Sequence, residues 1–136
     1  MKDGKPTYTY NFLGLQRFTV SASQPLAAGK ATIRFEFASD GPGMGKGGIG
    51  TIFVNGQKVA EGRIEHTQCC FFSADEGADV GVDEATPVTE DYKEGNNKFT
   101  GKIEKVTIDL KEMKAADKGE AEQSRKEASL KKSLSD

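Results

Sequence analysis

The fold of this chain is decided by residues 49–64, which read IGTIFV-NG-QKVAEGRI. Two β-type runs, 49–54 and 57–64, flank the pair Asn55-Gly56. Both central residues of a type I′ turn need a positive φ, which Asn and Gly adopt more readily than other residues. The stretch therefore predicts a β-hairpin whose turn is Asn55-Gly56.

Further strands are predicted on both sides of the hairpin, because apolar and polar residues alternate with a period of two. In residues 31–37, Ile33, Phe35 and Phe37 fall on one face. The other predicted strands are residues 7–12, 16–22, 69–73 and 99–110. About seven short strands with no helical period between them predict an all-β fold, an antiparallel β-sandwich.

Two of these strands change phase along their length. Val59 and Ile64 are five residues apart, so they cannot share one face of a regular strand, and we expect a β-bulge near Glu61-Gly62. A similar slip in residues 99–110 predicts a second bulge near Glu104-Lys105.

The last 26 residues differ in character. Ala, Glu and Lys dominate residues 111–136, where Leu130 and Leu134 lie four apart. This composition predicts a weakly amphipathic helix, either solvated or docked on a neighbour outside this chain. The expected organisation is thus a β-sandwich domain over residues 1–110 and a charged helical tail over residues 111–136.

Composition excludes several classes of function. The chain has 136 residues, with 19 basic and 21 acidic side chains, and this balance argues against a nucleic-acid binder. No apolar run approaches the roughly 18 residues of a membrane span. The adjacent cysteines, Cys69 and Cys70, would strain a bridge between them, so we interpret both as small apolar residues.

A glycine-rich segment, GMGKGG at residues 43–48, formally fits the dinucleotide pattern G-x-G-x-x-G. That fingerprint must open a helix, whereas a strand is predicted here, so we do not expect a nucleotide. The glycines instead indicate positive φ angles or a close backbone approach. We take them as interface candidates: Gly43, Gly45, Lys46, Gly47 and Gly48.

A long acidic loop follows residue 74. Eight carboxylates and one lysine give residues 75–94 a net charge of −7, so the rest of the chain carries about +5. Carboxylates gathered on a loop suit Ca²⁺, with Asp75, Asp79 and Asp83 as candidate ligands; no other cofactor is expected. The alternative is a solvated or partner-facing loop, in which Asp75 and Glu76 join the interface candidates.

The single histidine, His66, lies at the end of the hairpin. We interpret it as a structural group and an interface candidate, because no serine- or cysteine-centred relay surrounds it. No catalytic residue is assigned in this chain.

A long ordered series of residues resembles the C-terminal region of bacterial arylsulfatases. It opens with KPTYTYNFLGL at residues 5–15 and includes IRFEF at 33–37, GKGG at 45–48 and VNG at 54–56. It continues with GRIEHTQ at 62–68, FSADE at 72–76, DVGVD at 79–83 and Pro87-Val88, and ends with NKFTGKI at 97–103 and VTIDL at 106–110.

The resemblance implies a non-catalytic accessory domain of a sulfuric ester hydrolase. We expect it to pack on the catalytic domain, in the same polypeptide or a neighbouring chain, and to shape the access of substrate. The family's signature, C/S-x-P/A-x-R, is absent, because Ser73 and Ala74 stand where its arginine would follow Cys69 and Cys70. We therefore expect no activity from this chain alone. The resemblance implies a strand before the abrupt Asp3-Gly4 turn, so we expect either a fragment or a gene product truncated at an internal Met.

The expected fold is a jelly-roll of the laminin-G or concanavalin kind, and such folds often bind sugars. A free-standing carbohydrate-binding module is therefore the alternative function, although the chain lacks Trp. Neither a nucleic-acid partner nor a membrane is expected. The cellular location depends on a secretory signal that would lie upstream.

Overall fold

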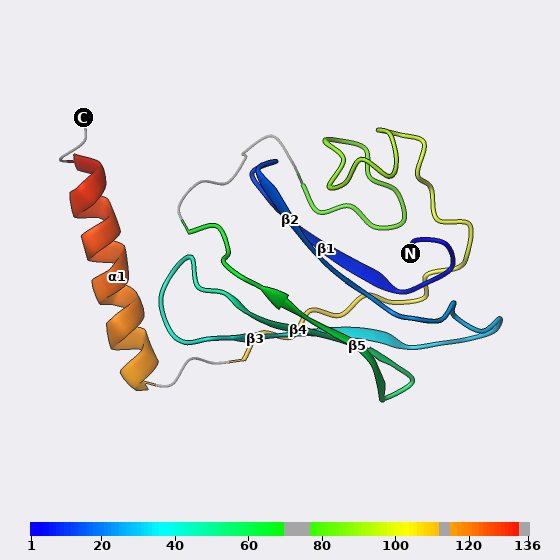
Figure 1. Cartoon of the computed structure of the whole chain (residues 1–136), viewed down its shortest axis with the longest axis horizontal. Helices are drawn as coiled ribbons and strands as arrows, with labels where there is room; N and C mark the ends of the chain where they lie inside the picture. Colours follow the sequence, from blue (N-terminus) through cyan, green and yellow to red (C-terminus); the bar gives the residue numbers. More distant parts are fainter. Residues whose placement is uncertain (70–76, 112–114, 134–136) are drawn as a thin grey trace. The chain divides into compact units, whose positions relative to one another are not determined.

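The computed structural model describes residues 1–69, 77–111 and 115–133. Along the chain lie β1 (Thr7–Phe12), β2 (Gln16–Ser21), β3 (Ile33–Ser39), β4 (Gly48–Val54), β5 (Gln57–Ile64) and α1 (Ala115–Ser133) (Figure 1). Internal contacts divide the chain into two compact units, Met1–Cys70 with Met113–Asp136, and Phe71–Glu112.

The strands form two antiparallel sheets, one of β1 and β2 and one in the order β3-β4-β5. This confirms a mostly β fold with antiparallel pairing. The predicted turn is also confirmed, because Asn55 and Gly56 have φ angles of 50° and 85°. The β1–β2 connection has the same backbone handedness, with φ angles of 55° at Leu13 and 73° at Gly14.

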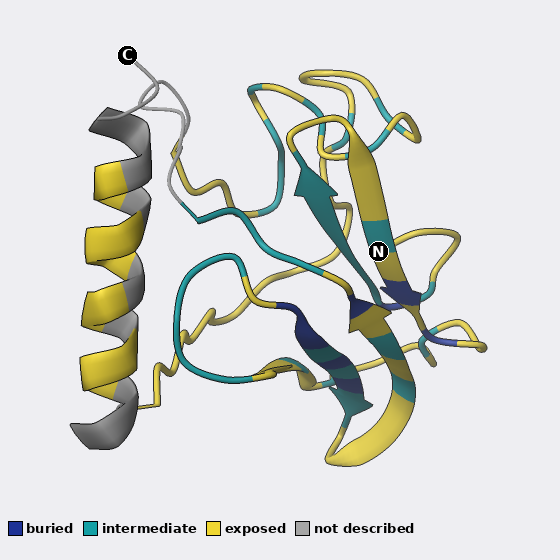
Figure 2. Cartoon of the chain, turned by 60° about the vertical axis from the view of Figure 1, so that its left-hand side comes forward, coloured by how far each residue is buried: buried dark blue, intermediate teal, exposed yellow. Residues whose placement is uncertain are grey.

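The core lies where β2 packs on β4 and β5. Val20, Ala22, Ile52 and Ile64 are its buried apolar residues, and Figure 2 shows buried positions along β4. Gly62 makes room for Val20, since an added Cβ there would lie 2.8 Å from Val20 Cγ2. The Tyr8 and Phe35 rings stack with centroids 3.7 Å apart. A Cβ on Gly50 would likewise lie 2.9 Å from the Phe35 ring. Val20 and the Phe35 ring therefore occupy space that the glycines leave free.

The predicted bulge occurs in β5 but not at the predicted place. Ile52 pairs with Ala60 and Phe53 pairs with Lys58, so Val59 is the extra residue. Glu61 and Gly62 stay in regular register. The extra residue lies close to the hairpin turn, and Val59 itself remains partly exposed. The bulge shifts the alternation of the strand by one residue, and Ile64 therefore points into the core.

The predicted strand at residues 99–110 is wrong. Phe99 N donates to Gly81 O at 2.7 Å, but residues 105–110 make no backbone hydrogen bond with any described residue. A strand requires a partner edge as well as an alternating sequence. The second predicted bulge therefore has no ladder to interrupt.

The predicted strand at residues 69–73 lies mostly outside the described residues. Cys69 itself is not in a strand. It is disulfide-bonded, which corrects the interpretation of a small apolar thiol. The other cysteine of the chain, Cys70, is not among the described residues.

The predicted helical tail is confirmed by α1, which spans 19 residues. Lys126 Nζ lies 2.9 Å from Glu122 Oε1, an i, i+4 pair on its exposed surface. Within the described residues, no helix combines the length and apolar character that crossing a membrane would require.

Candidate functional site

The glycine loop, residues 41–48, connects β3 to β4. Gly43 and Gly45 have φ angles of 104° and 73°, which side chains with a Cβ rarely adopt. The expectation of positive φ angles in this loop is confirmed. Gly45 also lies against the chain after β5, since an added Cβ would sit 3.4 Å from Thr67 O.

Gly47 and Gly48 are buried by close backbone approach. A Cβ on Gly47 would collide with the carbonyl oxygens of Ile64 and Glu65. A Cβ on Gly48 would collide with Ala38 O and the Phe37 ring. Both glycines are therefore required by packing within the chain, whatever the loop contacts outside it.

An ion pair closes the base of the loop. Arg63 Nη1 and Nη2 donate to Asp40 Oδ1 and Oδ2 at 2.6 Å and 2.5 Å. Asp40 N also donates to Gly47 O at 3.0 Å, so one residue ties β5 to both ends of the loop. Hydrogen bonds from Arg63 hold the pKa of Asp40 below its usual range, and Asp40 raises the pKa of Arg63.

Residues 65–68 form a second support beside the loop. Thr67 Oγ1 donates to Lys46 O at 2.8 Å, and Thr67 N donates to Gly45 O at 3.4 Å. Lys46 remains exposed at the outer surface of the loop. The structure thus places four of the predicted interface candidates on one supported loop and the fifth, Gly48, at the start of β4. The four are Gly43, Gly45, Lys46 and Gly47.

His66 comes from the same supporting segment and is half-buried. Its ring meets Phe12 and Phe18 edge-on, with centroid separations of 4.3 Å and 5.3 Å. Such contacts hold the imidazole as a packing group between aromatic rings. His66 therefore lies beside the glycine loop but packs on the rings of β1 and β2.

Gln68, two residues after His66, makes polar contacts that the sequence did not indicate. Gln68 N donates to the Tyr10 hydroxyl at 2.6 Å, and Gln68 Oε1 accepts from Cys69 N at 2.8 Å. Gln68 Nε2 is buried and has no hydrogen-bond partner among the residues that the structure describes. These bonds tie the supporting segment to β1.

The acidic loop belongs to the unit Phe71–Glu112, and its carboxylates organise its own backbone. Asp79 Oδ2 accepts from Glu84 N at 3.0 Å, and Asp83 Oδ1 accepts from Ala85 N at 3.2 Å. Tyr92 donates its hydroxyl hydrogen to Asp83 Oδ2 at 2.5 Å. Burial, and then this bond, raise the pKa of Tyr92.

Of the predicted Ca²⁺ ligands, Asp79 and Asp83 are described, whereas Asp75 and the interface candidate Glu76 lie outside the described residues. Among the described residues, no three carboxylate, histidine or cysteine groups gather as a metal site.

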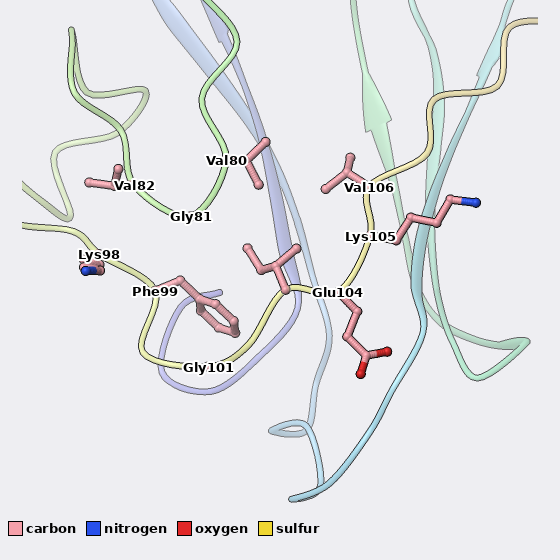
Figure 3. Close-up of a pocket in the computed structure, with 10 residues that line it drawn as sticks. Val80, Gly81, Val82, Lys98, Phe99, Gly101, Glu104, Lys105 and Val106 are labelled. Carbon is pink, nitrogen blue, oxygen red and sulfur yellow. The ribbon is translucent and has the colours of Figure 1, made fainter.

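An open groove of about 540 Å³ lies in the same unit (Figure 3). Val80, Phe99, Ile103 and Val106 provide its apolar lining. In Figure 3 the Lys105 side chain extends away from the groove. The other charged residues that line the groove are Lys98 and Glu104.

Sequence reasoning missed Asp40, Arg63 and Thr67 as parts of the site. Arg63 is 23 residues from Asp40, and Thr67 is 21 from Lys46, so no local spacing links them.

No protein-family model, curated protein or solved structure matches the chain.

Proposed function

We propose that this chain is a non-catalytic accessory domain of an arylsulfatase-like sulfuric ester hydrolase. Its glycine loop, residues 41–48, packs on the catalytic domain, which lies in the same polypeptide or in a neighbouring chain. The type of parent enzyme rests on the ordered sequence resemblance alone. The packing role rests on the way the loop is held.

The observation that carries the packing role is the double support of the glycine loop. The Arg63–Asp40 pair closes its base, and Thr67 binds the Lys46 carbonyl from the side. A loop held in one conformation loses little entropy when a partner binds. The same supports leave the Lys46 side chain exposed to a partner.

The chemistry around the loop also favours contact over catalysis. Asp40 and Arg63 bind each other through two parallel hydrogen bonds, which leaves neither poised to transfer a proton. His66 contacts the rings of Phe12 and Phe18. The contacts described for these three side chains are therefore structural ones within the chain.

The proposal is tested by adding the chain to the sulfatase catalytic domain encoded nearest to it in its genome. Calorimetry should detect binding, and Lys46→Glu should weaken it by about tenfold, equivalent to about 1.4 kcal/mol. Lys98→Glu makes the same charge change in the other unit and should leave the affinity unchanged. No binding, or equal effects of both variants, would refute the packing role.

A second assay addresses activity directly. The chain alone should not hydrolyse a chromogenic aryl sulfate, and turnover in a preparation free of other sulfatases would overturn the accessory role. Specific binding on a glycan array, without binding to the catalytic domain, would instead identify a carbohydrate module.

A further inference from the structure

Two complementary edges in this chain lack a partner. β3 pairs with β4 on one side, and no described strand pairs with its other edge (Figure 1). Residues 105–110 have a strand-like sequence but make no backbone hydrogen bond with a described residue. Unpaired strand edges present rows of N–H and C=O groups that can bind another chain.

We propose that residues 105–110 of one copy add to the free edge of β3 in a second copy. Exchange in both directions would give a symmetric dimer in which each copy donates one strand and accepts one. This proposal does not depend on the accessory role, because it uses surfaces other than the glycine loop.

The apolar side chains of the two segments match in spacing. Val106, Ile108 and Leu110 alternate along the donated segment, and all three are exposed. On β3, Ile33, Phe35 and Phe37 occupy one face, of which Ile33 and Phe37 are exposed. Antiparallel pairing with Leu110 opposite Ile33 also sets Ile108 opposite Phe35 and Val106 opposite Phe37, so it aligns the two apolar faces.

The charges of the other face select the direction of pairing. In the antiparallel register Asp109 lies opposite Arg34, and Lys105 lies diagonally from Glu36. A parallel register that aligned the same apolar faces would set Asp109 opposite Glu36, where two like charges repel. Charge complementarity therefore favours the antiparallel arrangement.

β3 is a better acceptor than the free edge of β5. The register of β3 with β4 is continuous from Ile33 to Ser39, so its backbone presents a regular edge. β5 carries the bulge at Val59, and bulges hinder strand addition.

Sedimentation velocity of the full chain should show a concentration-dependent dimer of twice the 14.6 kDa chain mass. Ile108→Lys should raise the dimer dissociation constant at least about tenfold, because a buried apolar side chain is lost. Leu15→Lys is the matched control, since Leu15 is 80% exposed and Ile108 is 81% exposed. It should leave the dimer intact.

Charge reversal gives a second test. Asp109→Arg should weaken the dimer, and adding Arg34→Asp should restore it. A wild-type chain that stays monomeric, equal effects of the two lysine variants, or no rescue would overturn the proposal. So would a monomer whose amides at residues 105–110 are protected from exchange, because that pairing lies within one chain. Ile108→Lys should still bind the catalytic domain, which separates this test from that of the proposed function.

Discussion

The Arg63 guanidinium donates two parallel hydrogen bonds, of 2.6 Å and 2.5 Å, to the Asp40 carboxylate. Arg63 belongs to β5, and Asp40 directly follows β3, on the opposite side of β4. The pair therefore spans the three-stranded sheet at the base of the glycine loop. Both side chains remain about two-fifths exposed, so salt and pH act on the contact directly.

Loss of this contact should loosen the loop without unfolding the sheet. In Arg63→Gln, the Asp40 amide, which donates to Gly47 O, should exchange its hydrogen faster than in the wild type. Lys58→Gln removes an exposed ion pair with Glu61 away from the loop and serves as the control. Hydrogen exchange measured by NMR distinguishes the two variants. Equal exchange rates of the Asp40 amide in both would contradict a role of the Arg63–Asp40 ion pair in holding the loop.

The same contact predicts a dependence of stability on acid. Hydrogen bonds from Arg63 lower the pKa of folded Asp40 below 3.8, so the contact stabilises the fold fully above that value. Its contribution is lost as the pH falls through the lower, folded pKa. The difference in unfolding free energy between wild type and Asp40→Asn should therefore shrink as the pH falls from 3.8 through the folded pKa of Asp40. It should also shrink with added salt. A difference that is independent of pH would be inconsistent with this pair.

Gly47→Ala should destabilise the protein by about 1–3 kcal/mol, because its Cβ would overlap the backbone carbonyls of Ile64 and Glu65. Gly41→Ala lies in the same loop, where an added Cβ meets nothing within 4 Å. It should change stability by less than about 0.5 kcal/mol. Urea unfolding of both variants gives the comparison, and similar losses would argue against the close approach.

Tyr92→Phe should weaken the acidic loop by about 1 kcal/mol, because Asp83 loses a donor and Val88 N loses its acceptor. The pKa of Tyr92 is raised above 10.0, first by burial and then by the bond to Asp83. Its contribution is therefore present below pH 10.0 and is lost as the pH rises through the higher, folded pKa. Burial also raises the pKa of Tyr8, so absorbance titration of the phenolates should show late titration by both Tyr92 and Tyr8. Only the Tyr8 component should remain in the variant.

Removal of divalent cations should leave the melting temperature unchanged. Asp79 and Asp83 already accept hydrogen bonds from the backbone of their own loop, which stabilises the loop without an ion. Thermal melts with and without a chelator provide the measurement. A lower midpoint in the chelator would contradict this expectation and support Ca²⁺ binding.

The parts that sequence reasoning predicted well are those governed by local backbone preference. β1 and β5 begin and end at the predicted residues, and Asn55-Gly56 forms the predicted turn. Alternation and turn chemistry act over a few residues, so they can be recognised without knowing the rest of the fold. The positive φ angles of Gly43 and Gly45 were predicted for the same reason.

Features that need a distant partner were predicted poorly. The bulge was expected near Glu61-Gly62, but the pairing with β4 places it at Val59. Residues 99–110 alternate like a strand, yet no described backbone pairs with residues 105–110. A sequence pattern states which faces a strand would have, and it does not supply the edge that a strand requires.

The amino-acid sequence alone therefore specifies a mostly β chain with a defined hairpin, a glycine-rich loop and a helical tail. Tertiary structure alone decides that Arg63 reaches Asp40 and that Gly47 must be glycine. The reason is physical: turns and strands follow from dihedral preferences of neighbouring residues, whereas ion pairs and steric limits depend on side chains that only folding brings together.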